Sequence, residues 1–211
     1  MAWFDKSAGE FIPLVKPFAG KPITYVEVGV WKGDSAAWML ENILTHPDAR
    51  GHGIDPYPID AKHGQAEIEK IQADVAERLS QYSQKFLLHD RLSVECLNDF
   101  AEWDRMNGME PFIDLLYLDG DHTAGAVVCD WCAAWPLLKV GSVVIFDDWG
   151  IGKRKHHRHV PEAFDAIRLS FGDMIQVIHE GPLQAAVRIT AKEPPLEPKM
   201  ERLARIRARK G

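Results

Sequence analysis

The sequence predicts an α/β protein with a Rossmann-like, doubly wound and mainly parallel sheet and helices on both faces. Residues 112–149 contain two apolar runs of strand length, FIDLLYLD and SVVIFDD, on either side of a helical pattern. A β-branched run at 23–29 enters a glycine loop and then a second helical pattern. Two short runs at 174–180 and 184–190, separated by a glycine and a proline, predict a strand pair with one antiparallel member.

Four carboxylates and a histidine follow the two strands of the 112–149 unit. They are Asp119, Asp121, His122, Asp147 and Asp148. A right-handed crossover brings the ends of two parallel strands to the same sheet edge, where α/β proteins place their chemistry. Close like charges are costly unless a cation or a shared proton relieves them. We therefore expect the active site at this edge.

Composition indicates one soluble domain. The chain has 211 residues, of which 46% are hydrophobic, enough for one substantial core. A net charge of −6 argues against nucleic acid as the main partner. No apolar run approaches the roughly 18 residues of a membrane span, and the N-terminus does not resemble a signal peptide, so we expect a cytoplasmic protein. Cys129 and Cys132 form a CxxC inside a helical pattern, which favours free thiols over a metal or redox site.

The first elements resemble a nucleotide-binding half. Residues 1–20 contain prolines that predict a short helix or turn followed by irregular chain. The loop after the strand at 23–29 reads EVGVWKG, an ExGxxxG pattern formed by Glu27, Gly29 and Gly33. Glycine lets a backbone approach a ligand closely, and the helix that follows offers unpaired amides.

The next strand ends in an acid, Asp55, which lies 22 residues beyond Gly33. An acid at the end of the second strand of a doubly wound sheet can accept hydrogen bonds from ribose hydroxyls. A cofactor that contains a nucleoside is therefore implied. An amphipathic helix at 65–82, a strand at 85–89 and a helix from Ser93 follow. Asp90 and Ser93 lie either near an adenine or at the helix as simple caps.

The remaining elements complete the sheet. Apolar residues continue the helix of the 112–149 unit through residue 138, at Val127, Trp131, Trp135 and Leu138. A basic stretch, Lys153 to His159, leaves from the same edge as the acids and either is a solvated loop or grips an anionic substrate. A helix begins at Val160. The tail at 191–211 is proline-rich and then basic, so we expect a linker with a weak helix or disorder.

Three motifs together carry a family resemblance. EVGVWKGDS, GIDP and LDGDHTAGAVVCDW…PLLKVGSVVIFDDW resemble class I S-adenosylmethionine-dependent methyltransferases, especially methyltransferase domain family 24, over roughly residues 20–190. The resemblance implies a seven-stranded sheet with one antiparallel edge hairpin strand and a catalytic domain at 21–190. One departure is Ser142, where the family usually has a second glycine.

The resemblance also assigns roles to site residues. It places Glu27, Gly29 and Gly33 around the methionine part of the cofactor, Asp55 at the ribose, and Asp90 to Ser93 near the adenine. Related O-methyltransferases hold a divalent metal, here expected to be Mg²⁺, with carboxylates at the positions of Asp119, Asp147 and Asp148. The first of these lies near both cofactor and metal, and His122 occupies the position of a general base.

We therefore expect an O-methyltransferase that acts on a small hydroxylated metabolite or sugar. A metal-independent methyltransferase and a non-catalytic nucleoside-binding protein stay open as alternatives. A nicotinamide-dependent oxidoreductase would share the ribose acid, but its loop pattern is GxGxxG. A homo-oligomer is also left open.

Overall fold

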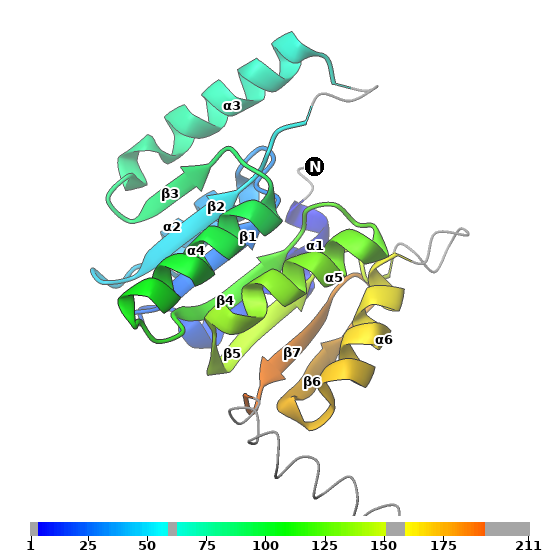
Figure 1. Ribbon diagram of the computed structural model, residues 1–211. Helices are drawn as coiled ribbons and strands as arrows, with labels where there is room; N and C mark the ends of the chain where they lie inside the picture. Colours follow the sequence, from blue (N-terminus) through cyan, green and yellow to red (C-terminus); the bar gives the residue numbers. More distant parts are fainter. Residues whose placement is uncertain (1–3, 59–62, 151–158, 193–211) are drawn as a thin grey trace, which may run out of the picture.

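The computed structural model describes residues 4–58, 63–150 and 159–192, and in this part of the chain seven strands form one sheet. The strands are β1 (Thr24–Val28), β2 (Arg50–Ile54), β3 (Phe86–His89), β4 (Ile113–Leu118), β5 (Leu138–Phe146), β6 (Ile175–Glu180) and β7 (Ala185–Ile189). Their order across the sheet is β3-β2-β1-β4-β5-β7-β6 (Figure 1). β1 to β5 run parallel, and β7 is antiparallel to both of its neighbours. The predicted fold class is confirmed.

Helices cover both faces of the sheet. The α-helices are α1 (Phe4–Val15), α2 (Asp34–Asn42), α3 (Gln65–Leu79), α4 (Ser93–Asn107), α5 (Ala124–Ala134) and α6 (Val160–Phe171). Short 3₁₀ segments are η1 (Lys16–Phe18), η2 (Ser80–Tyr82), η3 (Trp135–Leu137) and η5 (Gly172–Met174). In Figure 1, α4, α5 and α6 lie in front of the sheet, and α1 and α2 lie behind it.

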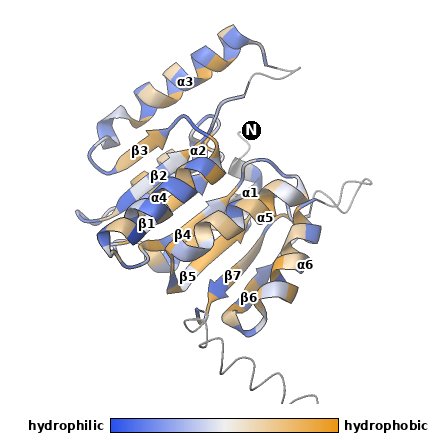
Figure 2. Cartoon of the chain, in the orientation of Figure 1, coloured by the Kyte–Doolittle hydropathy of each residue, from blue (hydrophilic) through white to orange (hydrophobic). Residues whose placement is uncertain are grey.

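Alternating strand residues divide the core into two layers. Val26 and Val28 of β1 join the layer beneath α4, α5 and α6, whereas Tyr25 faces α1, α2 and α3. The central strands β4 and β5 are strongly hydrophobic (Figure 2), and their residues contribute to both layers, as expected for parallel strands buried on both faces. The predicted amphipathic helix α3 buries the four residues that define its apolar stripe, Ile68, Ile71, Val75 and Leu79.

The N-terminal helix is longer than the prolines predict. It continues through Pro13 to Val15, although a proline in a helix removes one backbone hydrogen bond. Burial offsets this cost, because Phe11 and Val15 are completely enclosed in the layer that also contains Tyr117 of β4. The first helix is thus packed into the core of the sheet.

The helix of the 112–149 unit ends earlier than predicted. α5 stops at Ala134, and Leu138 is the first residue of β5. Pro136 cannot donate to a continuing helix, and the three residues of η3 turn the chain back to the sheet. The apolar spacing of Trp135 and Leu138 was therefore misleading. The departure at Ser142 has a structural role, because its hydroxyl donates to Ile113 O at 2.6 Å and joins β5 to β4.

In the described ranges no helix has the length and apolarity needed to cross a membrane. The three cysteines are free; Cys96 is buried, and Cys129 and Cys132 are exposed on α5.

Candidate active site

The candidate site lies at the carboxyl edge of the parallel strands. The first residue after β1, β4 and β5 donates a backbone hydrogen bond to the last residue of the adjacent strand. Gly29 N donates to Ile54 O at 2.9 Å, Asp119 N to Val28 O at 2.8 Å and Asp147 N to Leu118 O at 3.0 Å. These bonds extend the sheet by one residue at the ends of β1, β4 and β5. The predicted convergence of the acids follows from this register.

The glycine loop after β1 is shaped by contact with the chain itself. Gly29 has φ +88°, and a Cβ there would lie 2.0 Å from Asp119 O. A side chain at this position would therefore collide with the end of β4. Gly33, with φ +71°, lies at the N-cap position of α2. Both predicted glycines thus occupy positions that favour glycine, and at Gly29 the close neighbour is the backbone that carries Asp119.

Glu27 is fully buried beneath the glycine loop. It accepts hydrogen bonds from Tyr25 Oη at 2.9 Å and from Ser35 Oγ. Burial raises the pKa of the Glu27 carboxyl to about 7, although these two hydrogen bonds lower it and the charge of Asp55 raises it. Glu27 thus ties β1 to the first turn of α2, directly behind the loop expected to surround the methionine part of the cofactor.

Asp55 orders the same loop from β2. Its two oxygens accept hydrogen bonds from Trp31 N at 2.8 Å and Tyr57 N at 2.7 Å. Burial raises the pKa of Asp55, and the backbone hydrogen bonds oppose this shift. The carboxylate that was predicted to meet a ribose therefore also fixes the backbone of the glycine loop, and each oxygen retains a second lone pair for a ligand.

Asp90 and Ser93 are not helix caps. The N-cap residue of α4 is Leu92, which makes no side-chain capping bond. Asp90 instead accepts a hydrogen bond from Gln72 Nε2 of α3 at 3.0 Å, and Ser93 Oγ donates to Asp130 of α5 at 2.6 Å. The location of Asp90 and Ser93 near an adenine stays a prediction.

Asp119 and Asp147 form a hydrogen-bonded acid pair. Burial raises the pKa of Asp119 well above its ordinary value, and the charge of Asp147 raises it further. Burial also raises the pKa of Asp147, whereas hydrogen bonds from Gln184, Asp119 and Tyr117 lower it. Burial and the mutual repulsion of the two carboxylates thus oppose ionisation of both at once.

His122 lies beside the third acid of the cluster. Its Nδ1 is 3.2 Å from Asp148 Oδ2, and the imidazole is about half exposed. Asp148 has φ +55°, an uncommon backbone conformation for a residue with a side chain. Asp121 accepts a hydrogen bond from Thr123 N at 2.8 Å, and Thr123 caps α5. Asp121 thus holds the loop that presents His122.

The acids do not by themselves form a metal cluster. Among the residues that the structure describes, no group of three or more histidine, cysteine or acidic side chains is arranged to hold a metal ion. The predicted ligands are connected in pairs, Asp119 with Asp147 and Asp148 with His122. Metal binding by Asp119, Asp147 and Asp148 stays a prediction.

Two predicted segments lie outside the described residues. These are most of the basic stretch Lys153 to His159, of which His159 alone is described, and the tail beyond residue 192. The expected anionic acceptor stays a prediction.

Sequence reasoning missed two residues that are linked to the acid pair, Gln184 directly and Glu10 through the β6–β7 turn. Gln184 donates to Asp147, and Glu10 of α1 accepts hydrogen bonds from the turn that carries Gln184. The predicted antiparallel strand was the one available signal, because the start of such a strand lies at the carboxyl edge of its parallel neighbours. No sequence pattern indicated Glu10.

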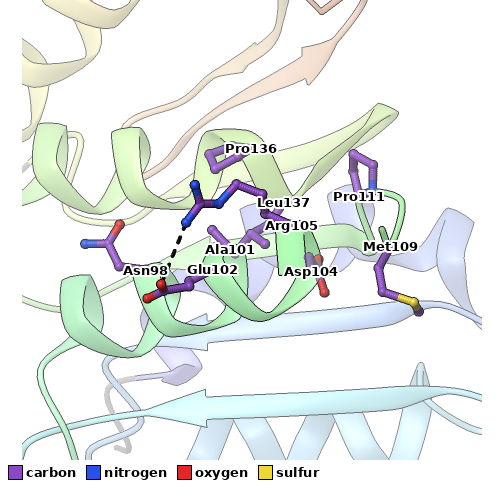
Figure 3. A pocket seen from close by; sticks show the side chains of 9 residues that line it. All are labelled: Asn98, Ala101, Glu102, Asp104, Arg105, Met109, Pro111, Pro136 and Leu137. Carbon is purple, nitrogen blue, oxygen red and sulfur yellow. Dashed lines mark ion pairs between the residues drawn. The ribbon is translucent and has the colours of Figure 1, made fainter. Parts of the chain in front are cut away.

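A cavity of about 560 Å³ lies elsewhere, between α4 and the segment around η3 (Figure 3). Its lining includes Met109 and Pro111, which precede β4. It also includes Pro136 and Leu137, which directly precede β5. It therefore lies at the amino ends of these strands, opposite the acids, and none of the predicted site residues line it.

Comparison with known proteins places the chain among methyltransferase-like proteins. The Methyltransf_24 family model, a methyltransferase domain, matches residues 26–149. The uncharacterized protein R132 of Acanthamoeba polyphaga mimivirus is 26% identical over 165 residues, which are 76% of this chain and 65% of the viral protein. The chain thus spans just under two thirds of that relative's length.

Solved structures share the fold. Calicheamicin methyltransferase CalS11 has a TM-score of 0.60 and 17% identity, with 89% of this chain and 80% of that chain covered. The O-methyltransferase TomG from Streptomyces achromogenes, in complex with SAM, has a TM-score of 0.60 and 16% identity, with 90% and 82% covered. The mycinamycin-pathway methyltransferase MycE, in complex with Mg and SAH, has a TM-score of 0.59 and 15% identity, with 94% and 53% covered.

Proposed function

The chain belongs to the methyltransferase domain family whose model matches residues 26–149, and from this premise we propose that it transfers a methyl group from S-adenosylmethionine to a hydroxyl of a small metabolite or sugar. The observation that carries the proposal is the arrangement at the carboxyl edge: the glycine loop and Asp55 lie beside an acid pair and an exposed histidine.

The residues at the loop fit the proposed cofactor. S-adenosylmethionine carries a sulfonium cation, and Glu27, Asp55 and Asp119 supply acidic groups around the loop after β1. Asp55 retains lone pairs for ribose hydroxyls after its two backbone hydrogen bonds. The fold of methyltransferases solved with SAM or SAH supports the same placement.

His122 is the proposed general base. An alcohol is a poor nucleophile at neutral pH, so its proton must be accepted as the methyl group is transferred. Asp148 faces Nδ1 of His122, so in this proposal it orients the ring and leaves Nε2 to accept the proton from the acceptor. The side chain is exposed, so an acceptor can reach it. The protein's remaining task is to align the acceptor oxygen with the departing sulfur.

A divalent metal is also proposed to assist the transfer. Asp119, Asp147 and Asp148 would hold it, because hard cations prefer carboxylate oxygens, and a carboxyl group must be deprotonated to bind such an ion. A bound Mg²⁺ would lower the pKa of the acceptor hydroxyl. The MycE complex with Mg and SAH supports this assignment by similarity of fold.

The test has two steps. Isothermal titration with S-adenosylhomocysteine, with NAD as the control ligand, should give a saturable signal for S-adenosylhomocysteine alone. Label from [methyl-¹⁴C]-S-adenosylmethionine should then move to one member of a panel of sugars and hydroxylated metabolites, anionic ones included, and His122→Asn should abolish the transfer. Binding without any transfer would favour a non-catalytic nucleoside-binding protein. Transfer that EDTA leaves unchanged would contradict the metal.

A further inference from the structure

The turn between β6 and β7 reaches the candidate site. β7 pairs antiparallel with β5, and Phe146 at the end of β5 is opposite Ala185 at the start of β7. The turn residue Gln184 therefore lies next to Asp147. It is completely buried, and its Nε2 donates to Asp147 Oδ1 at 2.6 Å and lies 3.4 Å from Tyr117 Oη.

A carboxylate of α1 holds this turn in place. Glu10 Oε1 accepts a hydrogen bond from Leu183 N, and Oε2 accepts one from Gln184 N, both at 3.0 Å. His179 Nε2 lies 2.9 Å from the same Oε2. At Gly181 an added Cβ would lie 1.8 Å from Glu10 Oε2, so the turn closes around the carboxylate.

Gln184 is thus held at both ends. Glu10 binds its backbone amide, and Asp147 binds its side-chain amide. A glutamine has three rotatable side-chain bonds, so its amide is aimed reliably only when its backbone is fixed. A charge-assisted hydrogen bond to a buried carboxylate is also among the stronger kinds, and an unpaired buried carboxylate oxygen would be costly.

We propose that Glu10 and Gln184 are positioning residues that fix the orientation of the Asp147 carboxylate, with Glu10 acting through the β6–β7 turn. Their importance for methyl transfer rests on the proposed function, in which Asp147 belongs to the site. The contacts themselves join helix α1 to the acid pair through residues far apart in the sequence, 10 and 184.

The coupling can be measured without an acceptor. In ¹⁵N–¹H spectra of the full chain, the side-chain amide of Gln184, assigned through bonds, should resonate downfield of exposed glutamines, and Asp147→Asn should move it toward the exposed range. Glu10→Gln keeps the size of the side chain but leaves one acceptor oxygen for three donors. It should move the same signal and speed amide exchange at Leu183 and Gln184 by roughly tenfold or more.

A control on the same hairpin separates this effect from a general loss of charge. The Glu180 carboxylate pairs with Arg168 Nη1 at 3.1 Å on the surface, so Glu180→Gln should leave the Gln184 signal and both exchange rates unchanged. If Glu10→Gln does not fold, Glu10→Asp replaces it. This variant keeps the carboxylate on a side chain shorter by one methylene group, so it should also move the Gln184 signal.

A Gln184 signal unchanged in the folded Glu10 variant or in Asp147→Asn would overturn the proposal. Titration of the wild type with S-adenosylhomocysteine is run in parallel. No binding there would contradict the proposed function and leave the measured coupling standing.

Discussion

Replacing Glu27 by glutamine should remove a large pH dependence of stability. The pKa of this fully buried carboxyl is about 7, against 4.5 for an unperturbed group. The folded protein therefore binds the proton more tightly than the unfolded chain does, and unfolding becomes easier as the pH rises from 4.5 to 7. With 1.36 kcal/mol for each pKa unit, the free energy of unfolding should fall by about 2.5 kcal/mol between pH 5 and pH 8 because of this residue.

Urea unfolding of the wild type and Glu27→Gln at half-unit pH steps measures this contribution. Other buried acids titrate in both proteins, so the quantity of interest is the difference between the two free energies of unfolding. It should change by about 2.5 kcal/mol in favour of the variant across this pH range. Glu41→Gln, which changes an exposed carboxylate on α2, is the control and should give a flat difference. A flat difference for Glu27→Gln as well would refute the assignment of a raised pKa.

Three further substitutions test the geometry of the site. Gly29→Ala should lower the free energy of unfolding, measured in urea, by at least about 3 kcal/mol, because the added Cβ would lie 2.0 Å from Asp119 O. Gly125→Ala is the control: its Cβ would meet nothing within 4 Å, so the free energy of unfolding should change by no more than about 1 kcal/mol. Thr123→Ala removes the cap of α5 and should cost about 1 kcal/mol in the same assay; no change would contradict the capping bond. Under the proposed function, Asp55→Asn should raise the dissociation constant of S-adenosylhomocysteine about tenfold by calorimetry, and an unchanged constant would remove Asp55 from the binding site.

The sheet was predictable because hydrophobic patterning and chain direction determine most of it. A glycine or an acid follows each parallel strand, and β4 and β5 are clear apolar runs, so the edge that gathers Asp55, Asp119 and Asp147 could be identified from the sequence. The end of α5 was predicted wrongly because the apolar spacing of the helix continues into the residues before β5. Trp135 continues the helical spacing of α5, yet the proline after it turns the chain into β5.

The interactions within the site were less accessible. Which carboxylates lie next to one another depends on ångström-scale positions that sheet twist and neighbouring loops determine, so the pairing of Asp119 with Asp147 could not be derived from spacing. Glu10 illustrates the limit most clearly. Its role comes from helix α1 packing beside a turn more than 170 residues later, and no local pattern marks it.

The position of β7 between β5 and β6 also bears on how the chain folds during synthesis. Until residues 185–189 leave the ribosome, β5 is an unpaired sheet edge, and Glu10 lacks the turn amides that it binds in the finished protein. The parallel strands β1 to β5 can form first, but the acid pair has its complete surroundings only when the last strand is inserted. Such long-range closure slows folding and exposes a sheet edge to aggregation, so truncation before β7 should harm solubility as well as the site.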